Sequence, residues 1–340
     1  MISRLSGSHS RETARRPLRM LGLAAFCALA AAWAPASQAA RAAPPDSSGF
    51  VLSAAVLNAE SASAASKPVA APARELESAV NGWIAALSAQ KPFAEWKQAS
   101  PTIEALGPGT HGWLVTLRLA EGRPVGYLVV YAAEDGTYRL GEYGAGSQPL
   151  FDAAALGRSL VANGLISSST PAFKAEKLYL HPFAAVWKVQ ANGQTYWLDA
   201  KTDEVLPLDD GQWDTLVQAA QASPPDPQQS ISAKQDRQTK AKIIAEAYRL
   251  NPPFDPFERL PWLMNEKPFS VKNEQSLLRW LEQDKQLRYV SEPFGDRMLY
   301  ALAVIGYERW SNGRIDVALD NEGVRFVPLT ALRAAGLFYK

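Results

Sequence analysis

The side chains that most often carry out catalysis or hold metals are scarce in this sequence of 340 residues, which has three histidines and one cysteine. His111 and His181 each stand just before a predicted strand, outside any His-Glu-x-x-His spacing that would bring zinc ligands together on a helix. No Gly-x-Ser-x-Gly motif occurs, and Ser147 has no identifiable base beside it. We therefore expect two ordinary strand-edge histidines and no catalytic residues, metal site or cofactor.

The densest group of carboxylates follows a predicted hairpin and consists of Asp199, Asp203, Asp209 and Asp210. A calcium loop needs oxygen ligands at alternate positions, and Lys201 occupies one of those positions here. The pattern therefore favours the solvated end of a hairpin over a cation site.

The glycine-rich stretch 141–146 lies between a predicted strand and a predicted helix, which is where phosphate loops occur. It has neither the lysine of a P-loop nor the spacing of a dinucleotide loop, and Glu142 would repel a phosphate. We interpret it as a turn that links two structural units. Paired carboxylates for glycoside hydrolysis stay open as an alternative, because their separation is set in three dimensions and the sequence singles out no pair.

Tryptophans can form a platform for carbohydrate, but their positions here favour core packing. Trp83 lies on the apolar face of a predicted helix, and Trp113 and Trp187 begin predicted strands.

A segment rich in proline and aromatic residues is the best candidate for a binding surface. Phe254, Phe257 and Trp262 are interspersed with prolines there, and proline holds a backbone extended before any partner arrives. Such a segment can dock a partner or lie as a strap across its own domain, and we slightly favour the strap.

The first 40 residues have the three parts of an export signal. Arginines form a basic start, Met20–Trp33 is apolar and uncharged, and Ser37–Ala39 offers small residues to a signal peptidase. The apolar run has 14 residues, which is fewer than the roughly 20 that a membrane-spanning helix needs. We therefore expect an extracytoplasmic bacterial protein, secreted or on the cell surface, with no membrane span in the mature chain; a retained anchor is the alternative.

Loss of this signal would change both the charge and the redox chemistry of the chain. The signal holds five of the 35 basic residues and one of the 34 acidic ones, which leaves 30 basic and 33 acidic residues and a net charge near −3. A nearly neutral chain without a basic stripe disfavours a nucleic-acid partner. Cys27 is the only cysteine and lies within the signal, so the mature chain can form no disulfide and no thiolate nucleophile.

The elements that would position these residues predict an α+β fold. We expect tandem small modules, each a helix followed by an antiparallel meander, and then a separate α+β C-terminal domain. The predicted boundaries are a flexible Ala/Ser/Pro-rich tether at 41–72, a first module at 73–150, a second at 151–222, a linker at 223–235 and the C-terminal domain at 236–340.

Hydrophobic periodicity and turn residues locate the individual elements. Helices are predicted around Leu76–Leu87, after Asp152 as N-cap, around Ile243–Tyr248, around Leu277–Leu281, and over Leu329–Ala335 with Gly336 as C-terminal cap. Strands are predicted at Trp113–Leu119, Val125–Tyr131, Thr137–Tyr143, Lys177–Leu180, Ala184–Gln190, Gln194–Asp199, Met298–Trp310, Ile315–Leu319 and Val324–Val327.

The hairpin formed by Ala185–Gln190 and Gln194–Val205 resembles the core hairpin of PepSY-type modules. In that family a strand with an aromatic residue is followed by a return strand that ends in a tyrosine–aliphatic–aspartate pattern, and then by a turn of the Lys-Thr-Gly-Glu kind. Trp187 is the aromatic residue here, and Tyr196 begins the return pattern. Asp203 stands where the family's turn has glycine.

The resemblance covers residues 152–208 and, more faintly, 74–143. PepSY modules and their cystatin-like relatives are extracytoplasmic α+β units of propeptides, peptidase-inhibiting segments and envelope proteins, without catalytic residues. More broadly, the chain resembles the exported, uncharacterised proteins of Gram-positive bacteria.

The resemblance implies a non-enzymatic binding or regulatory protein that recognises a peptide, a protein or a cell-wall component. Exposed edge strands would be the natural docking site. The alternatives are a carboxylate-dependent hydrolase acting on cell-wall glycan and an inhibitor of a co-secreted peptidase.

Overall fold

The computed structural model of the chain describes residues 74–107, 110–133, 135–167, 173–222 and 244–340. The predicted export signal (1–40), tether (41–72) and linker (223–235) lie outside the described residues. The chain divides into two units, Met1–Val51 and Leu52–Lys340, and every described residue belongs to the second.

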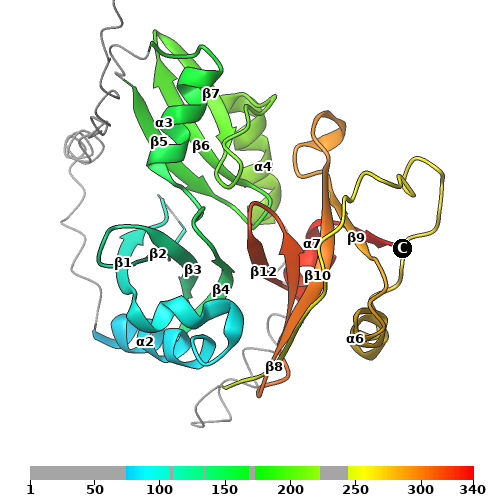
Figure 1. The fold of residues 1–340 in the computed structure, drawn as a ribbon. Coiled ribbons are helices and arrows are strands. Elements are labelled where there is room, and N and C mark those ends of the chain that lie inside the picture. Colours follow the sequence, from blue (N-terminus) through cyan, green and yellow to red (C-terminus); the bar gives the residue numbers. More distant parts are fainter. Residues whose placement is uncertain (1–73, 108–109, 134, 168–172, 223–243) are drawn as a thin grey trace, which may run out of the picture. The chain divides into compact units, whose positions relative to one another are not determined.

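The first region is a helical layer followed by a meander, as the sequence predicted (Figure 1). In the first helix the glutamates of the first turn suit the positive end of the helix dipole, and Leu76, Val80 and Leu87 form the buried face. The 3₁₀ helix and the outermost strand were not predicted, since the strand is almost entirely exposed and has no apolar alternation. The elements are α2 (Arg74–Leu87), η2 (Lys91–Gln98), β1 (Ser100–Ala105), β2 (Gly112–Arg118), β3 (Pro124–Ala132) and β4 (Tyr138–Ala145).

The second region contains a helix over a three-stranded antiparallel sheet of order β5-β6-β7. Asp152 accepts a hydrogen bond from the backbone N–H of Ala154 and so caps the helix, as predicted. Asn192 and Gly193 both have positive φ, which the two-residue hairpin turn requires. The elements are α3 (Ala153–Ala162), β5 (Lys174–Tyr179), β6 (Ala185–Ala191), β7 (Gln194–Asp199) and α4 (Asp210–Ala222), of which α4 was not predicted.

The C-terminal region contains the longest strand and two helices. The predicted strands and both predicted helices after residue 270 are confirmed within one or two residues at most ends. The elements are β8 (Ala245–Leu250), α6 (Glu274–Glu282), β9 (Arg288–Ser291), η3 (Gly295–Arg297), β10 (Tyr300–Trp310), β11 (Ile315–Asp320), β12 (Val324–Pro328), α7 (Leu329–Ala335) and β13 (Leu337–Tyr339).

The helix predicted around Ile243–Tyr248 is wrong, because Ala245–Leu250 forms strand β8 along β10. Exposure alternates from Ala245 to Tyr248, and Ile244 and Tyr248 are exposed while Ala247 is half-buried, so the residues that predicted a helix share no buried face. The unpaired hydrogen-bonding groups of β10 therefore decided the conformation, since a neighbouring strand satisfies them and a helix would not.

Gly336 ends α7 as predicted, but for a different reason. Its φ of −177° is extended, so the left-handed conformation is not what selects glycine here. A Cβ at this position would lie 2.2 Å from the carbonyl oxygen of Val290. Close approach of two backbones, and not cap geometry, excludes a side chain.

The C-terminal strands continue the sheet of the first region, whereas the sequence predicted a separate C-terminal domain. Among the described residues the strand order is β1-β2-β3-β4-β12-β11-β10-β9-β13, with β8 also paired to β10. Figure 1 shows β4 and β12 side by side, and they are antiparallel with Arg325 opposite Gly144. The rings of Tyr143 and Phe326 stack across this pair with centroids 5.1 Å apart. Each strand would otherwise expose unpaired backbone N–H and C=O groups along this edge, and their pairing satisfies those groups.

Two hydrophobic cores lie against opposite faces of the first region's meander. On one face, α2 and η2 pack with sheet residues that include Val115, Leu128 and Phe326. On the other face, Leu114 and Val129 pack with side chains of the second region, which include Leu156, Leu160, Trp187, Val189 and Leu198. The second region therefore covers the face of β2 and β3 that the first helix leaves open.

An α+β class with antiparallel sheets is thus confirmed. None of the helices in the described part of the chain combines the length and the apolar character that a membrane span requires.

Candidate functional site

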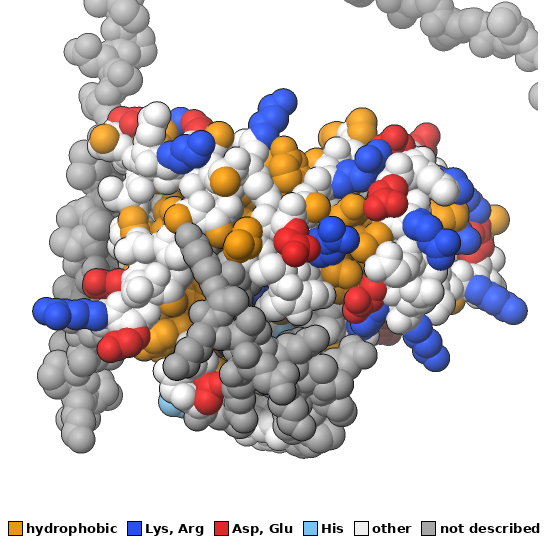
Figure 2. Space-filling model, turned by 90° about the horizontal axis from the view of Figure 1, so that it is seen from below, with side chains coloured by type: hydrophobic (Ala, Val, Ile, Leu, Met, Phe, Trp, Pro, Cys, Tyr) orange, Lys and Arg blue, Asp and Glu red, His pale blue; other side chains and the backbone are white. Residues whose placement is uncertain are grey.

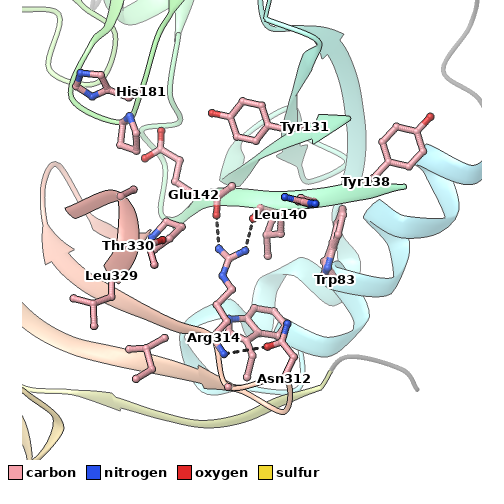
Figure 3. Close-up of a pocket in the computed structure, with 18 of the residues that line it drawn as sticks. Trp83, Tyr131, Tyr138, Leu140, Glu142, His181, Asn312, Arg314, Leu329 and Thr330 are labelled. Atoms are coloured by element: carbon pink, nitrogen blue, oxygen red, sulfur yellow. Dashed lines mark hydrogen bonds between the residues drawn. The ribbon is translucent and has the colours of Figure 1, made fainter. Parts of the chain in front are cut away.

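A pocket of about 720 Å³ lies where the first, second and C-terminal regions meet (Figure 3). The rings of Trp83, Tyr131 and Tyr138 surround it together with Arg314. Pockets of this size commonly hold small ligands or short segments of larger ones. The polar and aromatic lining residues are Trp83, Tyr131, Tyr138, Arg139, Glu142, Tyr179, His181, Glu274, Trp310, Asn312, Arg314 and Thr330.

Arg314 forms the floor of the pocket and ties two strands of the sheet together. Its Nε donates to Asp316 Oδ1 at 2.7 Å. Its two terminal nitrogens donate to the backbone carbonyls of Leu140 and Gly141 on β4, as Figure 3 shows. The guanidinium is thus held by strand β4 and the carboxylate of β11, and its role is to fix the floor.

Glu142 and Arg325 form a buried ion pair behind the pocket. Arg325 Nε donates to Glu142 Oε2 at 2.6 Å, and their side chains are 4% and 0% exposed respectively. Tyr179 donates its hydroxyl to the other carboxylate oxygen at 3.2 Å. Arg325 also donates to Asn321 Oδ1 and to the carbonyl of Pro182. Burial is the largest single influence and would lower the pKa of Arg325, but the interactions with Glu142, Tyr127 and Tyr179 together outweigh it, and the pKa is raised.

This ion pair corrects the interpretation of 141–146 as a linking turn. Glu142 lies within strand β4, and its carboxylate is a structural anion that joins all three regions. The sequence contained a signal, an acidic residue inside an apolar strand, but nothing showed that its partner lay 183 residues away.

A second buried network adjoins the first at the end of the hairpin formed by β6 and β7. Asp199 accepts hydrogen bonds from the backbone N–H groups of Lys201 and Thr202 and from the Tyr300 hydroxyl, the last at 2.7 Å. Lys201 Nζ donates to the carbonyls of Gln148 and Glu322. Burial, followed by repulsion from the guanidinium of Arg325, lowers the pKa of Lys201 to about 8.

The prediction of a solvated hairpin end is therefore wrong for Asp199 and Asp203, which are 6% and 8% exposed. It holds for Asp209 and Asp210, which are exposed. Asp203 has a φ of +57°, the conformation that favours glycine, and aspartate is among the few other residues that tolerate it. The departure from a Lys-Thr-Gly-Glu turn thus has a structural explanation. Within the described residues, no three metal-ligating side chains cluster here or elsewhere.

His181 lies in the loop between β5 and β6 and lines the pocket, whereas His111 stands just before β2 and does not line it. The ring Nδ1 of His181 accepts a hydrogen bond from the backbone N–H of Phe183 at 3.3 Å. Burial, and secondly the charge of Arg325, lowers the pKa of His181 to about 4, so the imidazole is neutral at pH 7.

A pair of carboxylates that the sequence could not single out lies within the sheet. Glu308 on β10 and Asp316 on β11 are direct partners in the ladder. Asp316 accepts from Trp310 Nε1 at 2.7 Å and from Arg314, while Glu308 accepts from Gln90 Nε2 at 2.8 Å. Burial, with a smaller contribution from Asp316, raises the pKa of Glu308 to about 8, so this acid is protonated at pH 7. Both carboxyl groups are 0% exposed and neither lines the pocket.

The three aromatic residues predicted as a binding surface differ in their surroundings, although Phe257 and Trp262 pack edge-on with ring centroids 6.4 Å apart. Phe254 is half-buried, with the guanidinium of Arg288 5.0 Å from its ring centroid. Trp262 packs edge-on against Tyr339 at 6.2 Å. Phe257 is 55% exposed. The segment is therefore mainly a strap on its own region, with one exposed aromatic ring.

Charged side chains of both signs are interspersed with small apolar patches on the face shown in Figure 2, where the described residues form no extended field of one sign. This distribution matches the small net charge of the sequence, +1 for all residues.

Comparison of the chain with models of known protein families, with curated proteins and with solved structures finds no match.

Proposed function

We propose that this chain is a secreted or surface-associated binding protein without catalytic activity, and that its ligand occupies the pocket lined by Trp83, Tyr131 and Tyr138. The pocket carries this proposal, since its rings are held in place and its volume suits a short peptide or a fragment of a larger partner. Tyr138 packs edge-on against Trp113 at 5.5 Å, and Tyr131 lies 6.2 Å from Tyr179. Preorganised rings lose little conformational entropy when a ligand binds.

The ion pairs formed by the charged lining residues favour a binding function over a catalytic one. Glu142 pairs with Arg325, Glu274 lies 3.4 Å from Arg333, and Arg314 is held by Asp316. General acid–base catalysis needs groups that can exchange a proton with the substrate. Side chains that are already engaged in ion pairs are less available to exchange a proton with a substrate.

A glycan hydrolase receives less support from the geometry. The pair Glu308 and Asp316 has the contrast of environments expected of two catalytic carboxyls, one neutral and one held by an arginine. Both lie inside the sheet with no exposed atom surface, so a sugar cannot lie between them.

Export remains part of the proposal and rests on the sequence of residues 1–40. Immunoblots of cell fractions from the producing bacterium should find the protein outside the cytoplasm, and retention of the whole pool in the cytoplasm would contradict that part.

Binding can be tested by titrating the purified exported protein with a panel of short peptides and cell-wall fragments, using calorimetry. Trp83→Ala should weaken every interaction that uses the pocket by roughly tenfold, because an aromatic wall contributes about 1 kcal/mol or more. Phe257→Ala is the matched control, since it removes an exposed ring outside this pocket.

If Phe257→Ala weakened binding and Trp83→Ala did not, the binding site would lie on the segment that contains Phe254, Phe257 and Trp262. Release of reducing sugar from wall glycan would favour the hydrolase. Slowing of secreted peptidases from the same culture would favour the inhibitor.

A further inference from the structure

One charged side chain of the pocket differs from the others in having no counter-ion. Three of the charged lining residues, Glu142, Glu274 and Arg314, each have an oppositely charged partner. Arg139, on β4, is half-buried and has neither an ion pair nor a side-chain hydrogen bond among the residues that the structure describes. The neutral His181 does not alter this balance. The described lining thus carries an uncompensated positive charge at Arg139.

The position of Arg139 within the sheet directs it to the aromatic wall. Arg139 on β4 and Tyr131 on β3 are direct partners in the antiparallel ladder, so their side chains lie on the same face. The ring of Tyr131 covers Gly141, where a Cβ would lie 2.6 Å from it. Glycine at 141 therefore lets the ring lie flat on the sheet beside the guanidinium.

Two further rings of the pocket lie on the other face of the sheet from Arg139, because Tyr138 is its neighbour along the strand and both Tyr138 and Trp83 pack against the core on the side of α2. Trp83 projects from α2 and Tyr138 precedes Arg139 on β4, and Figure 3 shows both rings at the same end of the pocket. A guanidinium binds a carboxylate through two parallel hydrogen bonds, and partly buried surroundings strengthen them. Aromatic walls favour a ring or another flat apolar group.

We infer that the pocket recognises a peptide segment in which a carboxylate lies next to an aromatic side chain, with the carboxylate on Arg139 and the ring against Tyr131, which shares the same face of the sheet. This inference rests on the proposed function, because it names the ligand of the same pocket. A neutral glycan fits less well, since the polar groups of Glu142, Glu274 and Arg314 are already engaged and a sugar needs many free partners.

The carboxylate can come from the end of a chain or from an acidic side chain within it. Four blocked tetrapeptides separate these sources: acetyl-Ala-Ala-Ala-Phe as the free acid, the same peptide as its amide, acetyl-Ala-Phe-Asp-Ala amide, and acetyl-Ala-Ala-Ala-Ala acid. The first and third each have a carboxylate beside a ring, the second lacks the charge, and the fourth lacks the ring.

Calorimetry with the full exported protein should show that the phenylalanine acid, the Phe-Asp amide or both bind at least roughly tenfold more tightly than the uncharged amide and the alanine acid. Arg139→Gln should reduce that binding by roughly 10- to 100-fold, as expected for a charge-assisted contact, and leave the uncharged amide unaffected. Arg139→Lys should bind these peptides with an affinity between those of wild type and Arg139→Gln, because lysine keeps the charge but cannot form two parallel hydrogen bonds. Arg158→Gln is the matched control, since Arg158 is exposed on α3 outside the pocket.

Equal binding of the acid and amide peptides, or equal effects of Arg139→Gln and Arg158→Gln, would overturn the inference. Failure of all four peptides at about 1 mM would overturn it as well. The proposed function would still stand in these cases if another ligand of the peptide and wall-fragment panel bound and lost affinity on Trp83→Ala.

Discussion

Two buried glutamates of the same sheet, Glu142 and Glu308, have opposite environments. Glu142 is 1% exposed and its carboxylate meets the guanidinium of Arg325 and the hydroxyl of Tyr179. Glu308 is 0% exposed, and its carboxyl group accepts a hydrogen bond from the side-chain amide of Gln90. The first acid joins three regions of the chain, and the second is held neutral by burial.

The comparison shows that burial alone does not determine how a carboxyl group affects stability. A paired buried charge contributes little net stability when intact but costs a great deal when one partner is removed. An unpaired buried acid instead adopts its neutral form, and its cost appears only as the pH rises. Four changes test this contrast, in order of decreasing expected effect.

Arg325→Met should lower the free energy of unfolding by about 3–5 kcal/mol, because it removes the charged partner of the buried Glu142 carboxyl group. Urea unfolding monitored by tryptophan fluorescence measures the loss. Adding Glu142→Gln to this variant should recover part of it. A loss below about 1 kcal/mol in the single variant would show that the pair is not the stabilising centre described here.

Glu308→Gln should remove a pH dependence of stability. The folded state keeps the Glu308 proton up to a pKa of about 8, whereas the unfolded chain releases it near the ordinary value of 4.5. The folded state therefore binds more protons across that window, and stability falls as the pH rises from 4.5 to 8, by up to about 1.4 kcal/mol per pH unit.

The free energy of unfolding of wild type and variant is measured at several pH values. The stability of Glu308→Gln relative to wild type should increase as the pH rises. His181 acts in the opposite direction, since its lowered pKa of about 4 makes stability rise between pH 4 and 6.5. The difference between wild type and variant cancels that contribution. Parallel pH curves would rule out a neutral Glu308.

Asp203→Asn tests an intermediate case. Burial, and then the charges of Asp152 and Asp199, raises the pKa of Asp203 to about 7. The folded state therefore binds more protons than the unfolded chain between pH 3.8 and 7, and stability falls as the pH rises through that range. Asparagine cannot titrate, so it should abolish this loss, and it tolerates the φ of +57°. We expect a gain of about 1 kcal/mol at pH 8, measured by thermal unfolding, and no gain would argue that the Asp203 charge is solvated.

Lys177→Ala should have the smallest effect, below about 1 kcal/mol. Lys177 on β5 pairs with Glu104 on β1 at 2.5 Å, but the side chains are 25% and 51% exposed. Water screens such a pair, so its short distance does not imply strength. If Lys177→Ala lowered the free energy of unfolding as much as Arg325→Met does, buried and exposed ion pairs would not differ in the way described above.

Local signals in the sequence were sufficient for much of the secondary structure. Asp152 caps its helix, Asn192 and Gly193 make a hairpin turn, and the apolar period of α2 identifies its buried face. Each of these depends on residues within a few positions of one another, and a short-range pattern encodes such interactions directly.

The sequence misled where a choice depended on a distant strand. The segment Ala245–Leu250 has an ambiguous period, and pairing with β10 made it a strand. Asp199 is in a polar stretch typical of solvent, yet the hydroxyl of Tyr300, 101 residues away, helps to bury it. The PepSY-type resemblance stays a prediction, and so do export and the absence of catalysis.

By itself, then, the sequence determined the class of the fold, the positions of its strongest helices and hairpins, and the chemical types available to a site. Only the tertiary structure decided that β4 and β12 are neighbours, that Glu142 meets Arg325, and that Trp83, Arg139 and Arg314 line one pocket. The physical reason is distance along the chain. Local conformation follows from neighbouring residues, whereas a buried charge and a pocket wall depend on which remote segments satisfy each other's hydrogen bonds and apolar surface.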